Sequence, residues 1–124
     1  MTEEKYFVGE LINLETDLYI KTENLFKLLS SVSVRKIKLI ELHLSEIYSL
    51  RNKLDLFIIL KPDLQHYELT SLISFWDKTF YEMKKITEDD DSNTSWMHSR
   101  FKNYESQHKT VDQMFRNYYD SLKD

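Results

Sequence analysis

The chain has 124 residues, the size of one domain, and its formal net charge is -4, which is not typical of nucleic-acid-binding proteins. Hydrophobic residues make up 41% and charged residues 31%, so the chain is too apolar to be disordered. It contains one Gly, one Pro and no Cys. A sheet protein needs more Gly and Pro in its turns, so long helices are favoured. The absence of Cys excludes disulfides, thiol catalysis and thiolate metal sites.

The first expected helix covers about residues 3–30. Apolar residues recur along it at steps of three and four, the spacing of one helix face. They are Phe7, Leu11, Leu14, Leu18, Leu25 and Leu28. Lys21 is the one polar step in this series. The pattern breaks after residue 30, and Ser33 is expected to cap the next helix because its hydroxyl can accept a hydrogen bond from a free backbone N–H.

The second expected helix covers about residues 34–60, with Arg51 as the polar step of its apolar series. The series is Ile37, Ile40, Leu44, Ile47, Leu54 and Ile58. Six further apolar residues lie off this face: Leu39, Leu42, Leu50, Leu56, Phe57 and Leu60. A helix that is apolar most of the way round is central in a bundle or lies beneath an oligomer contact. We therefore expect this helix to be the most buried of the four.

The third expected helix, about 63–86, begins after Pro62, which fits the first turn of a helix. Its apolar series is Leu69, Leu72, Trp76, Met83 and Ile86, widened by Ile73 and Phe80. An acidic run, 88–91, follows. The fourth expected helix, about 94–122, has an uninterrupted series with His108 as its polar member: Met97, Phe101, Tyr104, His108, Val111, Phe115, Tyr118 and Leu122. Asn93, Thr94 or Ser95 is expected to cap it.

Short connections between four helices of similar length favour antiparallel neighbours. We therefore predict that residues 1–124 form one all-α domain, an antiparallel up-down-up-down four-helix bundle. The alternative is a three-helix core with one helix exchanged between two chains.

Few residues have the spacing of a catalytic or metal site. A di-metal bundle needs Glu-x-x-His on two helices, and this chain has only Glu105-x-x-His108, with cations at the polar steps Lys21 and Arg51. Ribonucleases of the HEPN family place a His four to six residues after an Arg. Here Arg35 with His43 and Arg100 with His108 have seven intervening residues, so no catalytic role follows. We expect no catalytic residues, no metal and no cofactor.

The acidic loop shares part of a calcium-binding pattern. Asp89, Asp91 and Asn93 match the first three ligand positions of an EF-hand loop. Thr94 then stands where the loop requires Gly, and Arg100 where it requires the bidentate Glu. We expect a solvated acidic loop.

The cations allow two interpretations. Arg35, Lys36 and Lys38 form a basic patch at the start of the second helix, either a surface cluster near the acidic loop or a contact for phosphate. Lys21 and Arg51 either extend to the edge of the bundle or form polar contacts that fix its register. Together with His108, they are the candidate polar seam positions.

Eight Tyr and seven Phe are many for this length, and Tyr is enriched at protein interfaces. Several lie off the apolar series: Tyr19, Tyr48, Tyr67, Tyr81 and Tyr119. We predict a non-enzymatic interaction module, an adaptor, assembly subunit or small inhibitor or immunity-type protein, that forms a homodimer or a hetero-assembly. The alternatives are an RNA- or DNA-associated subunit using the basic patch, and a metal-dependent or ribonuclease-like enzyme centred on His108.

The expected location is cytoplasmic, with no membrane partner. Residues 2–5 are polar and largely acidic, unlike a secretory signal. The apolar run 56–60 is far shorter than the roughly 20 residues that span a bilayer.

Overall fold

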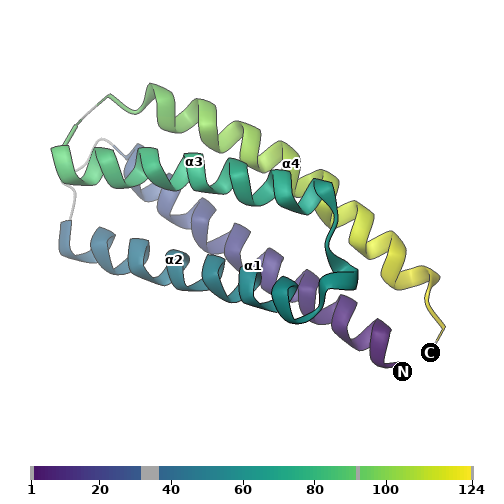
Figure 1. Ribbon diagram of the computed structural model, residues 1–124. Coiled ribbons are helices and arrows are strands. Elements are labelled where there is room, and N and C mark those ends of the chain that lie inside the picture. The colour runs from purple at the N-terminus through teal and green to yellow at the C-terminus, as the bar shows by residue number, and fades with distance from the viewer. Residues whose placement is uncertain (1, 32–36, 92, 124) are drawn as a thin grey trace.

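The computed structural model describes residues 2–31, 37–91 and 93–123. It contains α1 (Glu3–Ser30), α2 (Ile37–Leu60), the short 3-10 helix η1 (Pro62–Leu64), α3 (Tyr67–Asp89) and α4 (Ser95–Ser121). No strand occurs among these residues, so the prediction of an all-α protein with four long helices is confirmed (Figure 1). Within the same ranges, no helix combines the length and the apolar character needed to cross a bilayer.

Local chemistry explains where the helices begin and end. The Thr2 hydroxyl accepts a hydrogen bond from the Lys5 backbone N–H at 3.2 Å, and Glu3 and Glu4 follow in the first turn, where the helix dipole favours acidic residues. Pro62 begins η1, and α3 starts only at Tyr67, four residues later than predicted. The predicted cap Ser33 lies outside the described residues.

Asp90 ends α3 in the left-handed conformation, with φ of 47°, which Asp tolerates better than most residues. At the start of α4, Thr94 occupies the cap position without a side-chain hydrogen bond to the helix. The Asn93 side-chain oxygen instead accepts from the Ser95 N–H at 3.2 Å. The predicted capping region is therefore correct, and the hydrogen bond is made by its first residue.

The four helices form a bundle in which α1 packs against α2 and α4, and α3 packs against the same two helices (Figure 1). Side chains at the ends of the helices show which ends lie together. The Lys61 ammonium lies 3.6 Å from the Glu3 carboxylate, and the Lys5 ammonium donates to the Leu122 carbonyl at 3.3 Å. The beginning of α1 therefore lies beside the ends of α2 and α4.

The buried stripe of α1 differs from the predicted one. It runs through Val8, Leu11, Glu15, Leu18, Thr22, Leu25 and Leu29. The predicted series had Phe7, Leu14, Lys21 and Leu28 at four of these steps, each one residue earlier. An apolar side chain was expected at every step but one, whereas Glu15 and Thr22 are buried because they have polar partners inside the bundle.

The other stripes lie close to the predicted series. Helix α2 buries Ile40, Leu44, Ile47, Leu54 and Ile58, and α4 buries Met97, Phe101, Tyr104, Val111 and Phe115. Helix α3 adds Thr79 and Thr87 to the five predicted residues. Tyr118 is 37% exposed, although it was placed on the buried face of α4. Its hydroxyl donates to Glu4 at the surface, where both side chains are exposed.

A polar contact inside the core joins α1 to α3. The indole N–H of Trp76 donates to the Thr22 hydroxyl at 3.0 Å, and both side chains are essentially inaccessible to solvent. Another buried hydroxyl, that of Thr16, has no hydrogen-bond partner among the described residues. The Thr22 hydroxyl therefore has a hydrogen-bond partner in the core, whereas the Thr16 hydroxyl has none.

This difference predicts opposite effects for two similar substitutions. Thr22→Val keeps the shape of the side chain but leaves the Trp76 N–H without its acceptor, which should lower the free energy of unfolding by about 1–3 kcal/mol. Thr16→Val removes an unpaired hydroxyl and should leave that free energy unchanged or raise it. Urea denaturation of both variants measures the difference, and equal destabilisation would contradict the assignment.

Candidate functional site

Helix α2 exposes a set of large apolar side chains. They are Leu39, Leu42, Leu56, Ile59 and Leu60, with exposed fractions from 40% to 69%. The same helix buries five of its 24 residues, whereas α1 buries eight of 28. The prediction that α2 would be the most buried helix is wrong for the single chain, because one face of α2 packs in the bundle while its other apolar residues face solvent.

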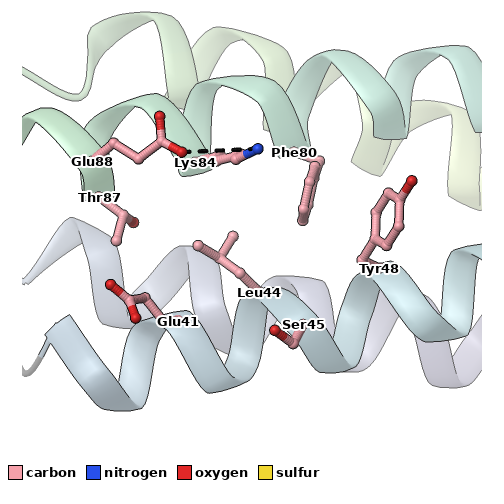
Figure 2. Close-up of a pocket in the computed structure, with 8 residues that line it drawn as sticks. All are labelled: Glu41, Leu44, Ser45, Tyr48, Phe80, Lys84, Thr87 and Glu88. Carbon is pink, nitrogen blue, oxygen red and sulfur yellow. Dashed lines mark ion pairs between the residues drawn. The ribbon is translucent and has the colours of Figure 1, made fainter.

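An open groove with a volume of about 480 Å³ lies between α2 and α3 (Figure 2). Tyr48 and Phe80 lie side by side in it, with ring centroids 5.4 Å apart. The polar groups that α3 contributes to the groove have partners on that helix: Lys84 lies 3.8 Å from Glu88, and the Thr87 hydroxyl donates to the carbonyl of Met83. These groups therefore hold one another along the helix and do not converge on a common point.

The three predicted polar seam positions lie in different environments. Lys21 is at the edge of the bundle, where its ammonium lies 3.3 Å from the Glu46 carboxylate and 38% of the side chain is exposed. Arg51 is more enclosed and joins α2 to α3 through two parallel hydrogen bonds to Asp77, at 3.0 and 3.1 Å. Hydrogen bonding to Asp77 raises the pKa of Arg51 above its usual value. Arg51 is thus both at an edge and a fixed polar contact between helices.

His108, the third position, contacts two residues of α1. Its Nδ1 lies 2.5 Å from the Glu15 carboxylate, and its ring stacks on the Tyr19 ring with centroids 3.8 Å apart. The Tyr19 hydroxyl is shared between two carboxylate acceptors, Glu105 at 3.0 Å and Glu23 at 3.1 Å. The four-residue cluster of Glu15, Tyr19, Glu105 and His108 therefore links α1 to α4 at mid-length.

Burial makes Glu15 the unusual member of this cluster. Only 3% of its side chain is exposed, and burial raises the pKa of its carboxyl, opposed by the hydrogen bond and charge of His108. Burial and the neighbouring Glu105 and Glu23 raise the pKa of the Tyr19 hydroxyl as well. Among the described residues, no group of three or more His, Asp or Glu side chains is arranged to hold a metal ion. The cluster connects helices and offers no metal site.

Glu15 was not predicted from the sequence. A signal was present, because Glu15 continues a regular series of steps of three and four through Leu11, Leu18 and Leu25, and the opposite helix provides His108 as a partner. The predicted series instead passes through Leu14 and Lys21, each one residue before the buried Glu15 and Thr22.

Two of the three basic-patch residues, Arg35 and Lys36, lie outside the described residues. Lys38 is exposed near the start of α2. Glu41 of α2 and Glu88 of α3 line the same groove, so the start of α2 and the end of α3 lie at one end of the bundle (Figure 2). The acidic loop that follows α3 is held by its own side chains: the Asp91 carboxylate accepts from the Asn93 N–H at 2.9 Å.

The off-series Tyr residues fall into two groups. Tyr19 and Tyr119 are half-buried, and Tyr119 packs against the only glycine, Gly9, where an added Cβ would lie 3.3 Å from the ring. Tyr48, Tyr67 and Tyr81 are 50% to 71% exposed. The tyrosine surplus is therefore divided between the α1–α4 contact and the surface.

The raised pKa of Glu15 predicts how stability depends on pH. In the folded protein this carboxyl keeps its proton to higher pH than in the unfolded chain, where its pKa is near 4.5. Its contribution to stability is complete below that value and is lost as pH rises through the raised pKa. Glu15→Gln does not titrate, so the stability of the wild type relative to this variant should fall as pH rises from about 4 to about 8.

Urea denaturation of both proteins across this pH range measures the effect. Glu105→Gln, which changes a half-buried member of the same cluster, is the control. A wild type that gains stability relative to Glu15→Gln as pH rises would contradict the prediction.

Comparisons with protein-family models, with curated proteins and with solved structures give no match for this chain, so its function is inferred from its own residues.

Proposed function

We propose that this protein is a non-enzymatic helical interaction module, an adaptor, assembly subunit or small inhibitor or immunity-type protein, that binds a protein through the outward face of α2. The observation that supports this proposal is the concentration of exposed Leu and Ile side chains on that one helix. Single exposed apolar residues are normal on a soluble protein, but a group on one element is typical of an interaction site.

The apolar residues of this face occur near both ends of α2. Leu39 and Leu42 lie in its first two turns, and Leu56, Ile59 and Leu60 lie in its last two. They cannot all turn inward without exposing the residues that α2 already buries, since the buried and exposed residues lie on different sides of the helix. A partner that covers this face therefore gains apolar burial that the single chain cannot provide.

We further propose the antiparallel up-down-up-down topology for the bundle. The contacts of Lys61 with Glu3 and of Lys5 with Leu122 support it, because they join the beginning of α1 to the ends of α2 and α4. At the other end of α1, the Ser30 hydroxyl lies 3.4 Å from the His98 ring in the first turn of α4. A bundle of this kind would present one long side of α2 to a partner.

The two alternative functions have less support. An RNA- or DNA-associated subunit would use Arg35, Lys36 and Lys38, and only Lys38 belongs to the described residues. A metal-dependent or ribonuclease-like enzyme would use His108, whose ring is stacked on Tyr19 and bonded to Glu15, with 13% of the side chain exposed. Such contacts favour a packing role. These alternatives and the cytoplasmic location stay predictions.

Photo-cross-linking tests the proposed surface. A benzophenone amino acid placed at Leu42 or Leu56 should form cross-links to a protein, because both positions are exposed on the α2 face. The same amino acid placed at Gln113, on the exposed side of α4, is the matched control and should form few. Mass spectrometry of the products, from the purified protein and from cells that express it, identifies the partner and the residues contacted.

Equal yields from all three positions, or no product from Leu42 and Leu56 in either setting, would contradict the proposed function.

A further inference from the structure

We infer that the partner of α2 is the same helix of a second copy of this chain, packed antiparallel about a two-fold axis that passes between Ser49 and Leu50. This inference rests on the proposed function, since it names the occupant of the α2 face. It depends on a row of residues that we call the α2 stripe: Leu39, Leu42, Glu46, Ser49, Lys53, Leu56 and Leu60.

The α2 stripe is one continuous face of the helix. Its residues follow one another at alternating steps of three and four, the spacing that keeps side chains on one side of a helix. All seven are exposed in the single chain. The stripe spans about 31 Å at 1.5 Å per residue, so two copies in contact would bury a long and narrow surface.

The stripe is complementary to itself when it is reversed. An axis between Ser49 and Leu50 brings Leu39 of one copy to the level of Leu60 of the other. It brings Glu46 to the level of Lys53, so that two opposite-charge pairs form, one on each side of the axis. Leu42 then lies within one residue, about 1.5 Å, of the level of Leu56. Apolar ends thus meet apolar ends, and the two charges near the middle of the stripe meet charges of the opposite sign.

Other arrangements of two copies do not match in this way. A parallel two-fold pair would place Glu46 against Glu46 and Lys53 against Lys53, which is unfavourable. Moving the antiparallel pair by four residues in one direction would place Leu42 against Lys53 and leave Leu60 without a partner. Moving it in the other direction would leave Leu39 without a partner and separate Glu46 from Lys53. Two-fold contacts require a surface that complements itself, whereas a different protein partner would impose no such symmetry on the stripe.

The contacts of the charged residues within one chain are compatible with this pairing. Lys21 of α1 lies 3.3 Å from Glu46, and 46% of the Glu46 side chain stays exposed. Lys21 therefore restricts the Glu46 carboxylate without covering it. In the dimer, Glu46 would lie between Lys21 of its own chain and Lys53 of the second copy.

A contact of one helix face is small, so we expect a dissociation constant on the order of micromolar.

Charge exchange at these two positions tests the pairing. Glu46→Lys sets two ammonium groups against each other in both pairs, and Lys53→Glu sets two carboxylates against each other. Each variant should therefore raise the dissociation constant at least about tenfold. The double variant restores opposite charges and should recover much of the wild-type affinity. An equimolar mixture of the two single variants should form a heterodimer. One copy then carries two ammonium groups and the other carries two carboxylates at these positions, so that both pairs across the axis are of opposite charge.

Sedimentation equilibrium of the purified proteins measures all four cases. Glu41→Lys is the control for a charge change on the same helix, because Glu41 is exposed but lies off the stripe, beside the groove. It should leave the dissociation constant within about twofold of the wild type. Circular dichroism of every variant checks that the helices remain intact. A wild type that stays monomeric at several hundred micromolar would overturn the inference, as would a dimer whose affinity is unaffected by the single exchanges.

The two proposals fail in different ways. A monomeric wild type whose Leu42 and Leu56 positions still cross-link to another protein would overturn the dimer and support the interaction module. A wild type whose α2 positions form no cross-links at all would overturn both.

Discussion

Helix α2 carries apolar side chains on two of its sides, and its neighbours in the bundle cover only one of them. Ile40, Ile47 and Leu54 are fully enclosed, while Leu42 and Leu60 on the other side are more than 60% exposed. A single chain cannot satisfy both sides, because turning the helix to bury one would expose the other. The proposed interaction surface follows directly from this constraint.

Polar pairs inside the bundle add to the apolar packing of α1 against α3 and α4. Apolar packing alone tolerates several registers, but a polar group in the core has only the partners that its position allows. Glu15 with His108 links α1 to α4, and Thr22 with Trp76 links α1 to α3. Helix α1 is thus fixed against two neighbours by pairs that a shifted register would break. Arg51 with Asp77 provides the equivalent contact between α2 and α3 at the surface.

Sequence periodicity was sufficient for the helices and for most of their buried faces. The observed bounds of α1, Glu3–Ser30, match the predicted range of about 3–30, because the apolar steps end near Ser30. The buried face of α1 was predicted incorrectly at four steps, because the prediction assumes a series of apolar side chains. A buried Glu can replace one of them only where a distant residue provides its partner. That information lies in α4 and is not local to α1.

The candidate site, like the buried face of α1, could be predicted from the sequence only in part. The apolar excess of α2 was evident from its sequence, but which of its sides is left uncovered depends on how α1 and α3 pack against it. Lys21 was identified as a polar position, yet its partner Glu46 lies 25 residues away on the next helix. Contacts between helices determine which side of α2 is uncovered and which residue pairs with Lys21. The spacing of residues within one helix does not predict either.

The central claim, an antiparallel contact between two copies of α2, is tested most directly by distances between spin labels. The chain has no Cys, so one label can be placed through Ser49→Cys or through Lys38→Cys, both at exposed positions of α2. Pulsed electron paramagnetic resonance should give a short distance between copies, about 10–20 Å, for residue 49, which lies beside the axis. For residue 38 it should give more than about 30 Å, since this position lies far from the axis. Similar distances at both positions, or no coupling between copies at either, would contradict the account.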